Sequence, residues 1–495
     1  MADWLPPSGI VGNRSFVRTG TWAARDDPRN CPAAGAVRAR PGVVARSASQ
    51  RTKDPLQTFA LGSLMTALDV VEYQRPRTRE RPAHDGLVTW TVAMTARYLA
   101  ARQADQASQE AVGRQRTHAV EHVWVARREL PSADHRGATY YEQTCWGRRY
   151  ASLDGAIREI WLLRPGTAAT PPGDAELAAA AYVAAFGDPC ANDAFNRRHT
   201  PLADLPPAHY TRPQQVRIVS FSCTDGSAVQ LLDWDCEEAA RRYSAEAAPA
   251  LARTVEGSDL APGSDCVKCK ALVGCTAVHQ SPGILGIDAA RRPRRSLSVS
   301  DLRAYSACPA RYHLTRQLKL RADRQEKDAI RRGRAVDAWL NMRHGARLAA
   351  GCRGLPGPDD PSQWSAGALS IAGDEARLGA RMLAQHAALC PLDGLAESEK
   401  VLVQRQVTAY DPELDLLLVA TPDLLYTRAG GWIWRETKTT TSYLWEGRPL
   451  LQQYPQLALA VLLVASGALG GDLSRSRIEL ELLYPVESRD VVYGS

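Results

Sequence analysis

Apolar residues in the C-terminal half of the chain follow two different spacings. Helical spacing begins behind Ser300, a residue type favoured at helix N-caps, and it predicts further helices over residues 323–348 and 365–389. From residue 401 onward the apolar residues alternate or run continuously, which is typical of strands. The predicted strands are residues 401–407, 416–420, 424–426, 432–436 and 477–484.

Two local signals connect these strands. Gly430-Gly431 predicts a tight hairpin turn. Residues 451–465 return to helical spacing, and Pro455 fits this helix only in its first turn. The order of helices, antiparallel strands, helix and strand predicts an α/β domain with a mixed sheet.

The N-terminal half shows a similar order of elements. Residues 139–163 contain strand-like pieces, residues 174–186 form an Ala-rich helical pattern, and residues 216–234 predict a hairpin around Asp225-Gly226. A predicted helix over residues 237–255 then leads to a segment with closely spaced cysteines. Both halves therefore run from helix through strands and a hairpin to helix.

A joint separates the two halves at residues 281–295. Pro282-Gly283 and the arginines on both sides of Pro293 have the composition of an exposed linker. We therefore divide the chain into an N-terminal domain of residues 1–280, a basic linker of residues 281–295 and a C-terminal domain of residues 296–495.

Length and composition narrow the class of protein. A chain of 495 residues has room for two to four domains, and 23% charged with 45% hydrophobic residues excludes a disordered or collagen-like chain. The apolar run of residues 457–465 is far shorter than the ~20 residues of a membrane span. Because no basic and apolar leader opens the chain, we expect a cytoplasmic protein without a membrane segment.

The net charge is +7, from 61 Lys and Arg against 54 Asp and Glu. The positive charge is concentrated in the linker and in residues 311–334. Such stretches are either solvated surface or a surface that binds phosphate groups.

Three ionisable residues carry the strongest chemical signal. Asp423 begins one predicted strand, and Glu436 and Lys438 end the next strand, on one face by the period-two rule. Carboxylates bind Mg²⁺, the metal lowers the pKa of bound water, and a Lys stabilises charge on a reacting phosphate. From these three residues alone, an alternative without a metal site is equally favoured: Asp423 would be an ordinary turn residue, and Glu436 and Lys438 an ordinary surface pair.

Four segments of residues 296–495, taken in order, resemble the PD-(D/E)XK nuclease superfamily and specifically its RecB-like branch. The resemblance lies in Ser298–Tyr312 with Cys308-Pro309, in the helix Gly333–Leu340, in Pro422-Asp423 with Glu436-Thr437-Lys438, and in Gln456 of a Gln-x-x-x-Tyr helix. It implies a restriction-endonuclease-like mixed sheet flanked by helices. A diverged copy of the same fold is implied for the N-terminal half, because that half opens with Cys31-Pro32 and closes with Cys266, Cys269 and Cys275, an arrangement that resembles the cysteines of iron–sulfur-bearing RecB-like nucleases. We expect that copy to be catalytically silent, because near Asp154 and Glu159 no Lys completes the motif.

The resemblance assigns roles to individual residues. Lys438 would orient or polarise the attacking water, Gln456 would position the DNA end or a phosphate, and Mg²⁺ or Mn²⁺ would be bound by Asp337, Asp423, Glu436 and the Thr437 carbonyl. Two positions depart from the family, which has a metal-binding His where this chain has Asp337 and a Tyr where it has Ala460. Asp337 keeps an oxygen ligand that suits Mg²⁺. Glu399 stands where RecB-like nucleases often carry an acidic residue, and a surface role is an equal alternative.

Closely spaced cysteines give a second signal. Cys266, Cys269 and Cys275 resemble the C-terminal triplet of iron–sulfur-bearing RecB-like nucleases, in which a fourth Cys lies far upstream before a proline. The resemblance implies a 4Fe–4S cluster with Cys31 as the fourth ligand. Three alternatives stay open: Cys308 as the fourth ligand, a zinc ion held by the triplet and His279, and unligated thiols.

The remaining cysteines are expected to be small buried hydrophobic residues, among them Cys145, Cys190, Cys223, Cys236, Cys352 and Cys390. The ten His residues show no paired spacing that indicates a metal site.

The resemblance implies a metal-dependent DNA nuclease, with exonuclease and endonuclease action both open, serving DNA repair, recombination or defence against foreign DNA. Because the chain has no P-loop, a partner helicase would be a separate chain. The first alternative is an inactive nucleic-acid-binding or scaffold protein on a decayed nuclease fold. A second alternative is a zinc-stabilised regulator in which Glu436-x-Lys438 is fortuitous.

Overall fold

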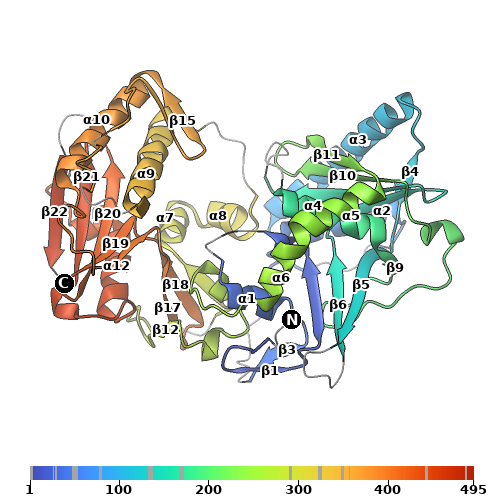
Figure 1. The fold of residues 1–495 in the computed structure, drawn as a ribbon, viewed down its shortest axis with the longest axis horizontal. Helices are drawn as coiled ribbons and strands as arrows, with labels where there is room; N and C mark the ends of the chain where they lie inside the picture. The colour runs from blue at the N-terminus through green and yellow to red at the C-terminus, as the bar shows by residue number, and fades with distance from the viewer. Residues whose placement is uncertain are drawn as a thin grey trace. The chain divides into compact units, whose positions relative to one another are not determined.

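The chain forms two compact units in the computed structural model (Figure 1). The first unit comprises Met1–Ala261, Asp265–Ala277 and Arg303–Asp323, and the second comprises Pro262–Ser264, Val278–Leu302 and Arg324–Ser495. The structure describes residues 4–25, 27, 30–46, 54–76, 81–131, 138–166, 172–288, 292–320, 326–346, 351–355, 357–440, 444–484 and 488–494.

The second unit is built on a five-stranded mixed sheet with the order β16-β19-β20-β21-β22. These strands are β16 (Val401–Val403), β19 (Leu424–Arg428), β20 (Gly431–Thr439), β21 (Arg477–Leu483) and β22 (Ser488–Gly494). All neighbours are antiparallel except β20 and β21, which run parallel. The parallel pair requires a crossover, and α11 (Leu450–Gln453) and α12 (Pro455–Ala465) provide it.

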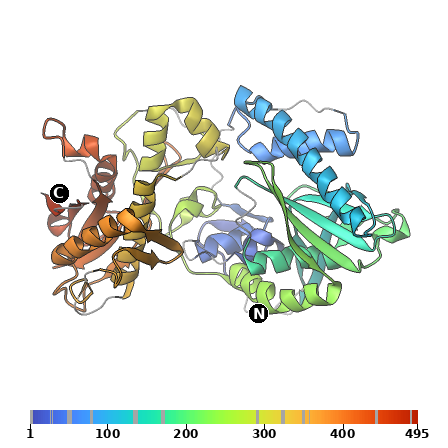
Figure 2. The same cartoon turned by 90° about the horizontal axis from the view of Figure 1, so that it is seen from above.

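Helices lie on both faces of this sheet (Figures 1 and 2). On one face, α12 packs into a core with Leu425, Trp434 and Leu480. On the other face lie α9 (Asp328–Ala346) and α10 (Gly373–Leu389), which contact each other and the sheet. Because side chains alternate along β20, Glu436 and Lys438 share the α12 face with Trp434, whereas Arg435 and Thr437 share the other face.

Smaller sheets complete the second unit. The β17–β18 hairpin (Val407–Asp411 and Leu416–Ala420) forms a four-stranded sheet with β12 (His279–Gln280) and β13 (Arg295–Leu297). The strands β14 (Gln363–Ala366) and β15 (Leu369–Ala372) pair as a hairpin between α9 and α10.

The first unit also contains a five-stranded mixed sheet, with the order β4-β7-β8-β10-β11. Its strands are β4 (Thr117–Ala119), β7 (Arg148–Ser152), β8 (Ile157–Arg164), β10 (Gln215–Ser222) and β11 (Ala228–Trp234). The helices α2 (Ala60–Glu72), α3 (Asp85–Ala111) and α4 (Asp174–Phe186) pack on the sheet. The helices α5 (Cys236–Arg242) and α6 (Ala248–Glu256) follow β11.

A second sheet of the first unit has the order β2-β6-β5-β9. Its strands are β2 (Phe16–Gly20), β5 (Val123–Pro131), β6 (Ala138–Thr144) and β9 (Asp188–Cys190). The strands β1 (Ile10–Gly12) and β3 (Val43–Ala45) pair separately, and α1 (Pro32–Arg38) lies between them in the chain.

The two five-stranded sheets share one topology. In both units the first strand of the sheet pairs antiparallel with the second, and the second pairs antiparallel with the third. The third strand then pairs in parallel with the fourth, and the fourth pairs antiparallel with the fifth. In each unit a hairpin, β5–β6 or β17–β18, is inserted between the first and second strands of the sheet. In each unit the second strand of that hairpin pairs in parallel with an earlier strand, which is β2 or β13.

The mixed α/β fold class expected from the sequence is confirmed, and the shared topology supports a diverged copy in the N-terminal half. Local assignments differ in several places. The first helix of the C-terminal half, α7 (Val299–Ala307), begins after Ser298 rather than after the expected Ser300, and Ser298 Oγ accepts a hydrogen bond from the backbone N–H of Asp301. The expected helix over residues 451–465 is divided into α11 and α12, and Pro455 is the first residue of α12.

Residues 363–372 form the β14–β15 hairpin, so the expected helix over residues 365–389 begins only at Gly373. The expected strand over residues 401–407 is interrupted between β16 and β17, where Gln404 has a φ of 50°.

Two segments around the expected linker also differ from the sequence interpretation. The side chain of Arg294 is only 7% exposed, and its Nε donates to Asp415 Oδ1 at 2.6 Å, so this arginine is not part of a solvated linker surface. Residues 303–323, which the sequence analysis assigns to the C-terminal domain, belong to the first unit by their contacts. They include α8 (Pro309–Tyr312) and most of α7 (Val299–Ala307). Arg291, one of the linker arginines, lies outside the described residues.

Within the described part of the chain, none of the helices combines the length and apolar character needed to cross a membrane.

Candidate active site

The Lys438 ammonium group is the centre of a cluster of oxygen atoms at the end of β20. Its Nζ lies 3.1 Å from Asp423 Oδ2, 3.1 Å from Glu436 Oε2 and 3.0 Å from the carbonyl oxygen of Thr437. The two carboxylate oxygens therefore lie no more than twice 3.1 Å apart. A cation at this place is surrounded by oxygen donors from three different residues.

The hairpin β19–β20 explains why Asp423 reaches this cluster. Asp423 immediately precedes β19, and Leu424 pairs with Arg435, so Asp423 lies beside the end of β20. The backbone N–H of Thr437 donates to Asp423 Oδ2 at 2.7 Å, which fixes the carboxylate. The side chain of Asp423 remains 20% exposed and that of Lys438 34%, so solvent reaches the cluster.

Glu436 is the most buried member of the cluster, with a side chain that is 7% exposed. Trp434, two residues earlier on the same face of β20, donates its indole N–H to Glu436 Oε1 at 3.0 Å. Burial raises the pKa of Glu436 and the charge of Asp423 adds to this rise, whereas Lys438 opposes it. Burial alone would lower the pKa of Lys438, but the two carboxylates raise it above its ordinary value.

Helix α9 contributes Asp337 to the same group of acids. Burial raises the pKa of Asp337 to about 6, the charge of Asp423 raises it as well, and Lys438 lowers it. Gly333 is one helical turn earlier on the same face of α9. A Cβ atom at Gly333 would lie 2.9 Å from Thr439 Oγ1, so the glycine permits the close approach of α9 to the end of β20.

Gln404 links the two aspartates and was missed by the sequence analysis. Its side-chain Nε2 lies 3.3 Å from Asp337 Oδ1 and 3.3 Å from Asp423 Oδ1. The residue occupies the break between β16 and β17 with a φ of 50°, a left-handed conformation that is uncommon outside glycine. Alternation of apolar residues around Gln404 concealed this break, because it predicts one continuous strand.

The donor set of this cluster suits a hard divalent cation. Asp337, Asp423, Glu436 and the Thr437 carbonyl offer only oxygen atoms, which Mg²⁺ prefers. Lys438 already places a positive charge among three of these donors. The residues present therefore fit the metal that this arrangement of acids implies.

Comparison with known protein families identifies the domain that carries these residues. Residues 296–490 match the family model described as the PD-(D/E)XK nuclease superfamily. This stretch of the chain is a PD-(D/E)XK nuclease superfamily domain. Among curated proteins, none matches the chain. The mixed sheet and its flanking helices are consistent with the restriction-endonuclease-like fold of this superfamily.

The first unit does not repeat the acids of the PD-(D/E)XK domain at the matching positions. Arg148, the first residue of β7, pairs with Trp161 of β8, as Leu424 pairs with Arg435 in the second unit. Asp423 immediately precedes Leu424, and the residue that precedes Arg148 is Gly147. Glu436 and Lys438 are one and three residues after Arg435, and the residues one and three after Trp161 are Leu162 and Arg164. Glu159, considered in the sequence analysis, is engaged by Arg217 at 2.5 Å. These observations support a first unit without a catalytic set.

Gln456 and Glu399, two further residues singled out in the sequence, lie in different parts of the second unit. Gln456 lies in the first turn of α12, on the crossover that follows β20, and it is half-buried. Glu399 accepts hydrogen bonds from Thr427 Oγ1 and from the backbone N–H of Ala429, at the opposite end of β19 from Asp423. Glu399 therefore supports the β19–β20 turn, and the alternative of a surface role holds for it.

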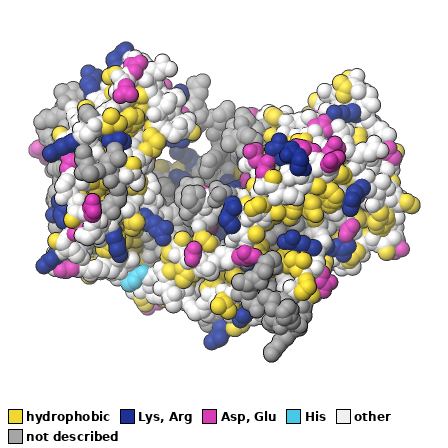
Figure 3. Space-filling view, in the orientation of Figure 1, with side chains coloured by type: hydrophobic (Ala, Val, Ile, Leu, Met, Phe, Trp, Pro, Cys, Tyr) yellow, Lys and Arg dark blue, Asp and Glu magenta, His cyan; other side chains and the backbone are white. Residues whose placement is uncertain are grey.

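The basic residues of 311–334 do not act as one group. Arg332 is buried and paired with Glu375 of α10, so it is not available to a ligand. Arg311, Arg316, Lys319, Lys327, Arg331 and Arg334 are exposed. On the face drawn in Figure 3, Lys and Arg side chains are scattered and interspersed with Asp and Glu.

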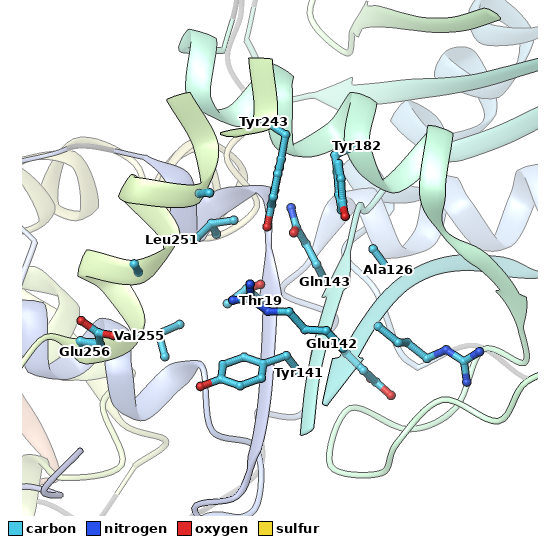
Figure 4. A pocket seen from close by; sticks show the side chains of 14 residues that line it. Thr19, Ala126, Tyr141, Glu142, Gln143, Tyr182, Tyr243, Leu251, Val255 and Glu256 are labelled. Carbon is cyan, nitrogen blue, oxygen red and sulfur yellow. The ribbon is translucent and has the colours of Figure 1, made fainter. Parts of the chain in front are cut away.

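A pocket of the first unit is lined by the rings of Tyr182 and Tyr243 on one side and by Tyr141 on the other (Figure 4). The rings of Tyr182 and Tyr243 stack with their centroids 3.8 Å apart. The buried carboxylate in its lining, Glu142, is bound by Arg18 and His199, which lower its pKa against the effect of burial. Because this acid is already neutralised by its partners, we assign the pocket no catalytic role.

The cysteines of the expected iron–sulfur site all belong to the first unit. Cys31 is the N-cap residue of α1, and the backbone N–H of Ala261 points at its Sγ from 3.4 Å. Cys266 is buried, whereas Cys269 and Cys275 are half-buried. Cys308 is the N-cap residue of α8, and His279 belongs to β12 of the second unit.

A second group of metal-ligand side chains was not anticipated. His344, Cys352, His386 and Cys390 are buried in the second unit, and one ligand atom from each lies within 4.8 Å of the others. Hydrogen bonding from the Cys352 thiol, with further contributions from His344 and His386, lowers the pKa of Cys390 although burial opposes this. The expectation that Cys352 and Cys390 are merely buried small residues is therefore incomplete, and the group can bind a metal ion. The one available sequence signal was His386-x-x-x-Cys390, a helical i,i+4 spacing.

Proposed function

We propose that the PD-(D/E)XK domain is a metal-dependent DNA nuclease of the RecB-like type, acting in DNA repair, recombination or defence against foreign DNA. One observation carries this proposal: Lys438 Nζ contacts an oxygen atom of Asp423, of Glu436 and of Thr437 at 3.0–3.1 Å. A decayed site has no reason to keep the two acids, the lysine and their mutual geometry. The match of residues 296–490 to the superfamily supports the same conclusion.

Each residue of the cluster has a role in phosphodiester hydrolysis. Asp337, Asp423, Glu436 and the Thr437 carbonyl would hold Mg²⁺ or Mn²⁺, which lowers the pKa of a bound water and neutralises charge on the phosphate. Lys438 orients the attacking water and donates hydrogen bonds to the phosphate oxygen on which charge develops. Trp434 and the Thr437 N–H hold the two carboxylates in position. Gln456 contacts the phosphate or the DNA end.

The exposed basic residues between Arg311 and Arg334 contact the DNA backbone in this proposal. Contacts of this kind are independent of sequence and weaken as salt concentration rises. A helicase would act as a separate partner, because the chain carries no P-loop.

Incubation of the purified full-length protein with end-labelled DNA tests the activity. We expect cleavage of single-stranded or double-stranded DNA with Mg²⁺ or Mn²⁺ and no cleavage when EDTA is present, because the acids cannot act without the cation. Gel analysis of the products separates stepwise exonuclease from endonuclease cleavage. A protein that binds DNA but cleaves neither substrate, with either metal and with a helicase supplied, would support the inactive scaffold instead.

We also propose that Cys31, Cys266, Cys269 and Cys275 bind a 4Fe–4S cluster in the first unit. Thiolates are the usual ligands of such clusters, and backbone N–H groups directed at the sulfurs tune them. The N–H of Ala261 is directed at Cys31 in this way, and Ala33 of α1 donates its N–H to Asp259, so the segment that leads into the triplet packs on α1. These contacts favour Cys31 over Cys308 as the fourth ligand.

Exchange of Cys31 for serine is expected to bleach the protein purified without oxygen, because the cluster loses a thiolate ligand. Absorption near ~400 nm, typical of iron–sulfur centres, should fall to the baseline, whereas the Cys308→Ser protein should stay brown. Iron and zinc analysis accompanies the spectra. A brown Cys31→Ser protein with a colourless Cys308→Ser protein would assign the ligand to Cys308, and colourless wild-type protein with zinc bound to the triplet would replace the cluster by zinc.

A further inference from the structure

Two histidines and two cysteines from separate segments meet in the interior of the second unit. His344 lies in the last turn of α9, His386 in the last turn of α10, Cys390 directly after α10 and Cys352 in the loop after α9. Their exposed fractions are 4%, 0%, 6% and 4% in that order. Such burial excludes a substrate and therefore a role as a nucleophilic Cys–His pair.

The distances within this group suit a single ion. His344 Nε2 lies 3.1 Å from His386 Nε2 and 3.9 Å from Cys390 Sγ, and one ligand atom of each residue lies within 4.8 Å of the rest. In a tetrahedral zinc site with bonds of about 2.3 Å to sulfur and about 2.1 Å to nitrogen, two nitrogens are about 3.4 Å apart and a nitrogen and a sulfur about 3.6 Å apart. The four donors are thus already arranged closely enough to share one zinc ion.

A hydrogen bond orients His386 for this purpose. Its Nδ1 lies 2.7 Å from Glu481 Oε1 of β21, so the ring donates Nδ1–H to the carboxylate and directs the lone pair of Nε2 toward His344 and Cys390. Metal-binding histidines commonly donate their other nitrogen to a carboxylate in this way. Glu481 is itself bound by Arg435 at 3.3 Å, which satisfies its charge.

Charge and helix direction favour a divalent cation at the same place. Two thiolates and two neutral imidazoles around Zn²⁺ give no net charge, which avoids the large cost of an unpaired buried ion. The helices α9 and α10 both end at the group, and the C-terminal ends of helices favour positive charge.

We propose that His344, Cys352, His386 and Cys390 bind one structural zinc ion that ties the ends of α9 and α10 to β21. All four positions of a tetrahedral ion are filled by protein atoms, as in structural rather than catalytic zinc sites. The zinc site does not depend on the proposed nuclease activity, because none of its four ligands belongs to the Lys438 cluster.

The site is nevertheless connected to that cluster. Glu481 Oε2 accepts a hydrogen bond from Thr437 Oγ1 at 3.0 Å, and the N–H of Thr437 donates to Asp423. Helix α9 carries Asp337 seven residues before His344, two turns away on the same face. An ion that fixes the end of α9 thereby also fixes the helix that presents Asp337.

Zinc analysis of the full-length protein tests the proposal. We expect Cys390→Ser and His386→Ala each to lose about one zinc ion per chain relative to wild type, whereas Cys223→Ser, at a buried thiol of the first unit, should lose none. Protein grown with Co²⁺ in place of zinc should show visible bands of a tetrahedral thiolate site, and these bands should be absent from Cys390→Ser.

Three results would overturn the proposal. The first is an unchanged zinc content in a Cys390→Ser or His386→Ala protein whose circular dichroism and elution volume match wild type. The second is a Cys352–Cys390 disulfide in peptides of the protein purified without reductant. The third concerns Cys269→Ser, a variant outside this site that breaks the triplet of the first unit. We expect this protein to hold about one zinc ion per chain. A Cys269→Ser protein without zinc would contradict the proposed site.

Discussion

Lys438→Ala is expected to lower metal-dependent DNA cleavage by at least ~10²-fold while DNA binding stays within about twofold of wild type. The ammonium group acts on one reacting phosphate, and removal of one such preorganised donor costs about 10²–10³ in rate. DNA binding is instead distributed over many contacts with the phosphate backbone. Cleavage rates at saturating DNA and binding titrations with Ca²⁺ in place of Mg²⁺ measure the two effects separately.

Lys400→Ala is the matched control for this change. Lys400 is an exposed lysine next to β16, and its backbone rather than its side chain pairs with Thr427. Lys400→Ala changes the net charge by the same amount as Lys438→Ala, but it should leave the cleavage rate unchanged. If Lys438→Ala and Lys400→Ala cleave DNA equally fast, Lys438 has no part in the reaction.

The sequence alone predicted the central hairpin of the second unit well. Period-two alternation placed Glu436 and Lys438 on one face, and Gly430-Gly431 placed the turn, so the approach of Asp423 to both followed from local rules. The family motif added Asp337, which lies on a helix distant in sequence. The structure brings these four residues together through contacts that were not readable from any one segment.

The misassigned elements have identifiable physical causes. Residues 363–372 carry Trp364 and Ile371, whose burial suits a helix or a short hairpin equally, and the turn at Gly367 with a φ of 58° decides for the hairpin. Gln404 breaks a regular alternation because tertiary contacts with Asp337 and Asp423 hold it in a left-handed conformation. The spacing of apolar residues within one segment cannot predict contacts with residues that are distant in sequence.

The His–Cys group escaped prediction for a related reason. Its ligands come from two helix ends and a loop, and only His386 and Cys390 are close in sequence. Three-dimensional packing of α9 against α10 creates the group, whereas the cysteine triplet was found because its spacing is local. A silent copy of the fold in the N-terminal half was already an expectation from the sequence, and the strand pairing shared by the two five-stranded sheets supports it although sequence identity between the halves is not evident.

Asp337→Ala is expected to reduce cleavage by ~10²-fold or more, and Asp337→His to retain or increase it. Alanine removes an oxygen donor from the metal cluster, whereas histidine supplies a nitrogen donor at the place where relatives of the superfamily carry one. Because imidazole is a softer ligand than carboxylate, the Asp337→His protein should favour Mn²⁺ over Mg²⁺ more than wild type does. Initial rates over a series of each metal measure this shift.

Asp328→Ala provides the control, because Asp328 is an exposed acid in the first turn of the same helix, α9. It should cleave DNA at the wild-type rate with both metals. An Asp337→Ala protein as active as Asp328→Ala would remove Asp337 from the metal site. If wild type and Asp337→His are both inert while the protein is folded and binds DNA, the acids of α9 and β20 have no part in DNA cleavage, and the scaffold alternative replaces the nuclease.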